Sequence, residues 1–242
     1  MKKATLILVT IVLSVIMFSC GNNTAKNNYG KLDTHFKKDL YNNFGVIKVE
    51  DKLSQNIGYE ADSTGVFFIS LKDVGKYHGK ICPGIATGFK MIRDVLDSLY
   101  PNGIVQRGQV QVISSKPTDL FDVAGYITGA RSFYGRGEIN RNDLMIDTTL
   151  NPHQYMSFAM IFRRKDNGQA YKVIFHKANL IAKEDRDFIF SVDKKALLGE
   201  MDRDTAKKFL NIVNTEVKRI LENGIRKDVY KIEKIKNNQQ GL

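Results

Sequence analysis

His78 and Cys82 are the two residues whose types and spacing best suit chemistry, and they lie in the segment Tyr-His-Gly-Lys-Ile-Cys-Pro-Gly at residues 77–84. A thiolate beside an imidazole serves either as half of a soft-metal site or as an activated nucleophile. Pro83 suits the first position of a helix, which would make Cys82 the N-cap residue. Free backbone N–H groups and the helix dipole favour an anion there, so we expect the thiolate to be stabilised. A buried structural cysteine beside a surface histidine is the alternative.

The N-terminal segment predicts export and lipid attachment. A basic start precedes an apolar run from Ala4 to Phe18, and a Ser-Cys-Gly sequence containing Cys20 follows. The run is shorter than the roughly 18–20 residues that a membrane-spanning helix needs, and its pattern resembles a bacterial lipoprotein signal. We therefore predict a signal peptide at residues 1–19 and a polar tether at residues 20–30, with Cys20 lipidated. A plain secreted protein or an uncleaved anchor would fit the same segment.

This interpretation sets the compartment and the partners. Lipidation of Cys20 holds the mature protein to the lipid bilayer of the bacterial cell envelope and leaves Cys82 without a disulfide partner. Cleavage removes two lysines and leaves 35 basic against 26 acidic side chains, a net charge of +9 in place of +11. An exported protein meets little nucleic acid and no basic-aromatic motif is present, so no nucleic-acid partner is expected. Anionic lipid headgroups or acidic cell-surface polymers would suit the positive charge as partners, but a merely solubilising charge is the explanation that we favour.

Hydrophobic periodicity predicts the elements that would position the two residues. Helices are expected from Pro83 to Tyr100, after the capping residue Thr118, and from Asp202 to Asn223. Strands are expected at 104–114, in a hairpin of 155–162 with 170–176 around an Asp-Asn-Gly turn, and at 187–192. Weaker patterns suggest a short helix at 35–43, a strand or helix start at 66–71, and a polar tail at 231–242.

The order of these elements indicates the fold class. Helices and strands do not alternate regularly and one strand pair is a hairpin, which favours an α+β fold over a doubly wound sheet. We predict a mixed or antiparallel sheet packed with helices. It would form a single core domain at residues 31–200, followed by a C-terminal helix and basic tail at residues 201–242.

Three ordered motifs resemble the formylmethanofuran dehydrogenase E-subunit family. That family has an aromatic residue, His-Gly-His, one further residue, Cys-Pro-Gly and a later glycine. It also has a helix leading into Thr-Gly-Cys and Gly-Lys-Gly, and then an aromatic hairpin. The matching parts of this chain, all between Leu71 and His176, are residues 77–90, Asp122 with Thr128-Gly129 and Gly135-Arg136-Gly137, and the hairpin Phe158–Ile174.

This chain departs from the family pattern at several positions, and these departures remove side chains that could ligate a metal. Lys80 stands where the family has its second histidine, and Ala130 replaces the cysteine of Thr-Gly-Cys. Asp119 aligns with another family cysteine, and the zinc-binding Cys-x-x-Cys appendage of some members is absent.

The resemblance implies a metal site made from what is left. His78 and Cys82 would be ligands, with Asp119 or Asp122 and water completing the set, and zinc or another transition metal accepts such mixed donors. Arg136, between two glycines, would offer backbone N–H groups and a cation to an anionic ligand. Acidic residues that merely complement a helix dipole, and a plain turn at Arg136, would explain these residues without function.

We therefore expect a lipid-anchored protein that binds a metal ion or a metal-containing small molecule in a cleft around His78 and Cys82. The family name is not taken as an activity, because methanofuran chemistry is cytoplasmic and archaeal in character. Two other functions stay open: an enzyme that uses Cys82 with His78 on an unknown substrate, and an interaction lipoprotein with a vestigial site. The resemblance also implies a homodimer.

Overall fold

The computed structural model describes residues 40–58 and 64–236. The chain divides into residues 1–34 and residues 35–242, and every described residue belongs to the second unit. The predicted signal peptide, Cys20 and the tether therefore lie outside the described residues. Of the predicted helix at 35–43, the described part contains one short 3-10 turn, η1 (Leu40–Asn42).

The smaller sheet has three strands in the order β2-β1-β3. Its central strand pairs antiparallel with β2 and parallel with β3. A short helix follows the central strand, capped by Asp51, whose side chain accepts from the amides of Leu53 and Ser54. The bounds are β1 (Val46–Glu50), α2 (Lys52–Asn56), β2 (Val66–Ser70) and β3 (Ile104–Gln106).

The larger sheet has five strands in the order β5-β4-β6-β7-β8. β4 pairs parallel with β5, and the remaining pairs are antiparallel. The predicted hairpin around Asp-Asn-Gly is confirmed as β6 and β7, and Gly168 takes the positive φ that this turn requires. The bounds are β4 (Val110–Ser114), β5 (Leu144–Ile146), η2 (Thr148–Leu150), β6 (Ser157–Arg164), β7 (Ala170–His176), η3 (Lys177–Asn179) and β8 (Tyr230–Lys234).

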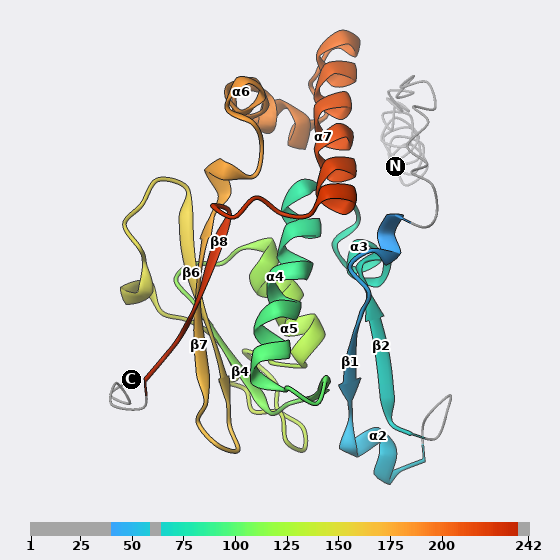
Figure 1. Cartoon of the computed structure of the whole chain (residues 1–242), viewed down its shortest axis with the longest axis vertical. Coiled ribbons are helices and arrows are strands. Elements are labelled where there is room, and N and C mark those ends of the chain that lie inside the picture. The colour runs from blue at the N-terminus through green and yellow to red at the C-terminus, as the bar shows by residue number, and fades with distance from the viewer. Residues whose placement is uncertain (1–39, 59–63, 237–242) are drawn as a thin grey trace, which may run out of the picture. The chain divides into compact units, whose positions relative to one another are not determined.

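Two helices fill the space between the sheets, as Figure 1 shows. Most side chains of α4 (Pro83–Leu99) are buried, and its charged residues Lys90, Arg93, Asp94 and Asp97 lie together on the opposite face, as in an amphipathic helix. α5 (Asp119–Thr128) lies beside α4. α3 (Leu71–His78) follows β2 directly and comes before α4 in the chain. Phe89, Ile92, Leu120 and Ile127 belong to one continuous core with residues of both sheets.

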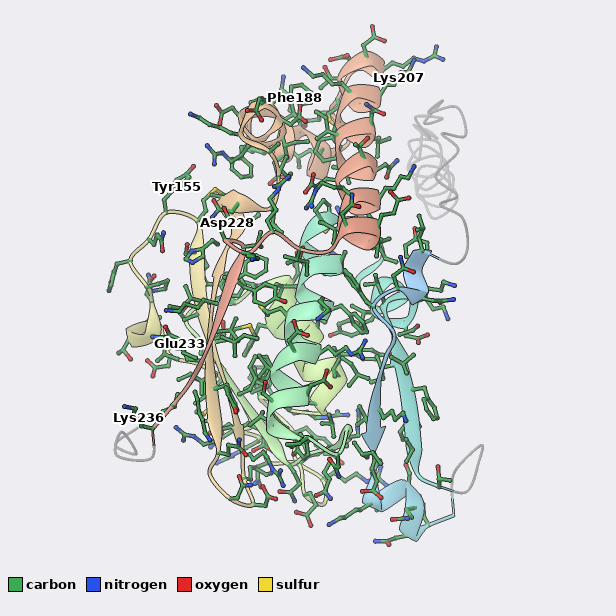
Figure 2. The ribbon with its side chains drawn as sticks, viewed as in Figure 1. Tyr155, Phe188, Lys207, Asp228, Glu233 and Lys236 are labelled. Atoms are coloured by element: carbon green, nitrogen blue, oxygen red, sulfur yellow. The ribbon has the colours of Figure 1, made fainter. Side chains whose placement is uncertain are left out.

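The two C-terminal helices extend this core. α7 (Arg203–Asn223) packs on α4 and adds Val217, Ile220 and Leu221 to the same core. α6 (Lys183–Leu198) faces α7, where Lys208 Nζ lies 4.2 Å from the centroid of the Phe188 ring. Figure 2 labels Phe188 on α6.

The two mixed sheets with helices confirm the predicted α+β class. The predicted helices at 83–100, after Thr118, and at 202–223 are confirmed as α4, α5 and α7. The segment 66–71 becomes the strand β2 and then the start of α3. Within the described ranges, no helix has the combined length and apolar character needed to cross a membrane.

Three predictions of secondary structure are wrong. The expected strand at 104–114 is split by a turn at Gly108 (φ 79°) into β3 and β4, which join different sheets. The expected strand at 187–192 lies inside α6, which Gly199 ends in the left-handed conformation. The expected polar tail begins with β8, which pairs with β7 and forms the edge of the larger sheet.

Candidate functional site

α3 is a short helix that fixes His78 at its C-terminal end. A capping box opens it: Asp73 N donates to Ser70 Oγ over 3.3 Å, and Ser70 N donates to Asp73 Oδ2 over 3.0 Å. The hydrogen bonds from Ser70 lower the pKa of Asp73. Gly79 ends the helix in the left-handed conformation (φ 92°), so His78 is its last residue.

The imidazole of His78 is half-buried, and its Nε2 atom is buried and unbonded among the described residues. Its side chain is 17% exposed, and Nε2 has no hydrogen-bond partner among the described residues. The nearest acidic atom is Asp119 Oδ2 at 4.0 Å, too far for a hydrogen bond. Buried polar atoms in native proteins are nearly always bonded, so Nε2 of His78 calls for an explanation.

Asp119 reaches His78 because α5 is in contact with α3 and also packs closely on α4. Thr118 caps α5 by accepting from Phe121 N over 3.2 Å, which makes Asp119 the first helical residue. Gly88 of α4 lies against Leu120, and a Cβ at Gly88 would overlap the Leu120 methyl groups. The carboxylate of Asp119 is 73% exposed, so it can change rotamer at little cost.

Two tyrosines, Tyr77 of α3 and Tyr126 of α5, stack on each other. The rings of Tyr77 and Tyr126 stack with centroids 4.7 Å apart and an interplanar angle of 13°. Burial raises the pKa of Tyr77, and the charge of Asp122 and the neighbouring Tyr126 raise it further. The exposed Asp122 therefore acts electrostatically on Tyr77 from the same helix that carries Asp119.

Cys82 lies where the sequence predicted it. It is the N-cap residue of α4 with Pro83 in the first turn, and it is a half-buried free cysteine. Its side chain makes no capping hydrogen bond to the helix. The N-cap position is confirmed, whereas stabilisation of the thiolate stays a prediction.

The four predicted metal ligands do not form a complete set. His78 and Asp119 face each other, but the described residues contain no group of three or more His, Cys, Asp or Glu side chains arranged to hold a metal ion. A zinc site that works with open positions usually has three protein ligands. These residues therefore fit a metal only in part: they offer an unbonded imidazole nitrogen and a movable carboxylate, and the metal must bring further donors.

Arg136 lies at a different place. Arg136 N donates to Ile139 O over 2.9 Å and Ile139 N donates back over 3.1 Å, which closes a tight turn. The backbone N–H expected to bind an anion is thus already bonded, and only the side chain remains available. That side chain lines a cavity beside α2 with Arg107 and Arg131, two arginines that sequence reasoning missed because no motif marks them.

One comparison with known proteins gives a match. The family model described as FmdE, molybdenum formylmethanofuran dehydrogenase operon, matches residues 77–226. No curated protein and no solved structure matches the chain. The match begins at Tyr77 and extends past the three motifs of the sequence, through α6 and α7.

Proposed function

The chain belongs to the FmdE family, and on that premise we propose that it is a membrane-tethered lipoprotein that binds a metal-containing small ligand at His78. The observation that carries the proposal is the Nε2 atom of His78, which is buried, has no hydrogen-bond partner in the described part of the chain, and lies 4.0 Å from a carboxylate oxygen of Asp119. A buried polar atom without a partner costs about 1–3 kcal/mol. A ligand that bonds Nε2 recovers this cost.

The donor set indicates the kind of ligand. A neutral imidazole nitrogen binds zinc, copper, nickel and iron, and a carboxylate is a common second donor. The carboxylate of Asp119 can rotate toward the imidazole because it is largely exposed. With two converging protein donors, the remaining coordination positions belong to water or to a small molecule. This favours a metal that arrives with ligands of its own over a bare ion held by the protein alone.

The lipid anchor and the oligomeric state are parts of the same proposal. The N-terminal pattern ending at Cys20 supports export and lipidation, which would place the protein on the bilayer of the cell envelope. Family membership supports a homodimer. Metabolic labelling with a fatty acid, compared between the natural chain and Cys20→Ser, tests the anchor. The sedimentation mass of the protein in detergent tests the dimer.

Metal content and cobalt titration test the site. We expect the full chain, purified without an affinity tag, to retain a transition metal or to bind Co²⁺ at one equivalent. His78→Ala should weaken this binding strongly, and Asp119→Asn should weaken it less. His153→Asn is the matched control, because His153 is exposed and its positive φ suits asparagine. Equal Co²⁺ binding by the His78→Ala variant and the natural chain would refute the site.

The same Co²⁺ titration tests whether Cys82 is a ligand of the metal. If its thiolate joins the metal, Co²⁺ binding produces a thiolate-to-cobalt charge-transfer band that Cys82→Ser removes. Cobalt binding without that band restricts the site to His78 and Asp119. Rapid alkylation of Cys82 by iodoacetamide in a protein that binds no metal would favour the thiol enzyme instead.

A further inference from the structure

A second candidate site lies at the other end of α5, in a cavity of about 280 Å³. Three separate segments line it: the start of α2, the turn between β3 and β4, and the loop that follows α5. We call it the arginine pocket, and its lining residues are Asp51, Lys52, Leu53, Arg107, Arg131, Tyr134, Arg136, Glu138 and Ile139.

The charge of the arginine pocket is positive. Four basic and two acidic side chains line it, which leaves a net charge of +2. Both acids are already engaged: Asp51 Oδ1 accepts from Leu53 N over 3.0 Å, and Glu138 Oε2 accepts from Gln109 Nε2 over 2.6 Å. Within the described ranges, Arg131 and Arg136 form no ion pair with either acid or with any other carboxylate.

Arg107 is the most deeply placed of the four cations. Its side chain is 24% exposed, and its Nε lies 3.5 Å from Asp51 Oδ2. Burial lowers the pKa of the Arg107 guanidinium, Asp51 opposes this, and the charge of Arg131 lowers it further. The positive charge of Arg107 is thus only partly compensated by the protein.

Two glycines, Gly129 and Gly135, allow the segments that line the arginine pocket to pack closely. Gly129 ends α5 with φ 77°, and a Cβ there would lie 2.7 Å from Arg107 Cγ, so the arginine stem packs directly on the backbone. A Cβ at Gly135 would lie 2.7 Å from Ile139 O, inside the turn that presents Arg136. Arg131 lies 5.9 Å from the centroid of the Tyr134 ring. The pocket is therefore built by close backbone packing as well as by loose surface side chains.

We propose that the arginine pocket binds a small organic oxyanion, a carboxylate or a phosphate ester carried on a flat or apolar body. Planar guanidinium groups bind such oxyanions through paired hydrogen bonds. The Tyr134 ring, Leu53 and Ile139 provide apolar wall for the body of the ligand. The site is separate from His78, because α5 has ten residues and a rise of about 15 Å lies between its ends.

Calorimetric titration of the full chain with phenyl phosphate tests the proposal. We expect saturable binding that inorganic phosphate competes with and that the neutral benzyl alcohol does not reproduce. Arg107→Gln and Arg136→Gln should each weaken phenyl phosphate binding roughly ten- to hundredfold. Arg203→Gln is the control, because it makes the same charge change at an exposed arginine that begins α7. Arg136 is exposed and forms no ion pair with any residue that the structure describes, so its variant keeps the test valid if Arg107→Gln fails to fold.

Three results would contradict the proposed oxyanion site. The first is the absence of any heat of binding with phenyl phosphate at millimolar concentration. The second is a loss of affinity in the Arg203→Gln control as large as the loss in the pocket variants. The third distinguishes a lipid headgroup from a soluble ligand: binding to vesicles containing phosphatidylglycerol, but not to phosphatidylcholine vesicles or phenyl phosphate, would mean a membrane surface. Loss of cobalt binding at His78 leaves these measurements unchanged, so the two proposals fail separately.

Discussion

At its N-terminal end α5 presents Asp119 to the imidazole of His78, and at its C-terminal end Gly129 packs against Arg107. The helix dipole favours an acid at the first place and cations at the second, which is the arrangement found here. The N-terminal end carries two acids, Asp119 and Asp122, and is held by apolar contact between α4 and α5. The C-terminal end is rich in charge and is held by loops.

Each end contains one polar group that the protein leaves partly unsatisfied. At the N-terminal end it is the unbonded Nε2 of His78, and at the C-terminal end it is the guanidinium of Arg107. Natural sequences usually break a local rule of satisfaction where function requires it. In the two sites that we propose, one helix would hold a metal at one end and an anion at the other, because its ends lie too far apart to share a ligand.

The largest expected effect is a double dissociation between the two ends. His78→Ala should weaken Co²⁺ binding about 100-fold and change phenyl phosphate affinity less than about twofold, and Arg136→Gln should do the reverse, because sites more than roughly 7–10 Å apart act additively. Paired titrations of both variants with both probes measure this. A large effect of either variant on both probes would break the comparison and indicate one composite site.

The next effect concerns the close approach of α4 and α5. Gly88→Ala should lower the free energy of unfolding by about 2 kcal/mol, because the added methyl group meets the buried Leu120 side chain. Urea unfolding measures the change. Gly84→Ala is the matched control in the same helix, since its Cβ would lie an ordinary 3.7 Å from Cys82 Sγ. In Gly88→Ala we expect metal affinity to fall and phenyl phosphate affinity to hold; equal stability of the two variants would refute tight packing at the N-terminal end.

Much of the helical part of the fold follows from the sequence. α4, α5 and α7 were predictable because each combines an apolar period with a recognisable start: Pro83 in α4, Thr118 before α5 and Asp202 before α7. The structure confirms the last two as caps, with Phe121 N and Thr205 N as donors. These signals are local, so single-sequence reasoning can use them.

The strands failed where long-range pairing decides. The sequence predicts a basic tail at β8, because its side chains are mostly polar. Only its pairing with β7 makes the segment a strand. A continuous β pattern at 104–114 gives no sign that β3 joins β1 while β4 joins β6. α6 contains the apolar residues Phe188 and Ile189, and this short apolar run is also typical of a strand. Only the contact of α6 with α7, which the sequence does not show, distinguishes the helix.

The site was predictable by type more than by geometry. The sequence identified His78 and Asp119 as donors, but their facing positions depend on contact between α3 and α5. Arg107 was not identified, because it becomes notable only when Asp51, Gly129 and the loop after α5 surround it. Lipidation of Cys20, the metal, the membrane and the homodimer stay predictions.

A smaller effect on stability compares the two incompletely satisfied groups, the imidazole of His78 and the guanidinium of Arg107. His78→Phe should raise the free energy of unfolding of the metal-free protein by about 1 kcal/mol, because it removes a buried unbonded nitrogen. Arg107→Met should lower it by about 1 kcal/mol, because Asp51 then loses its ion-pair partner. Chemical denaturation of both variants without metal or anion measures the difference. Destabilisation of both by the same amount would mean that the His78 ring is held by packing that a phenyl ring cannot reproduce.

The smallest effect separates the two ends by their response to acid. The pKa of Asp73 is lowered in the folded protein, so its contribution to stability is present above the unfolded pKa near 3.9 and is lost as the pH falls through the folded value. Because Asp73 is partly exposed, we expect only a few tenths of a kcal/mol. Asp73→Asn should flatten the acid limb of the stability curve, and the same change at the exposed Asp187 is the control.

Amide hydrogen exchange shows where this acid loss acts. In the natural chain, protection should fall in α3 before it falls at the C-terminal end of α5, because the capping box that holds α3 is the part that titrates. If the Asp73→Asn and Asp187→Asn variants lose stability along the same acid limb, the buried side chains of Leu71 and Val74 hold α3 without help from its cap. The position of His78 would then depend on apolar packing alone, as the contact between α4 and α5 already does.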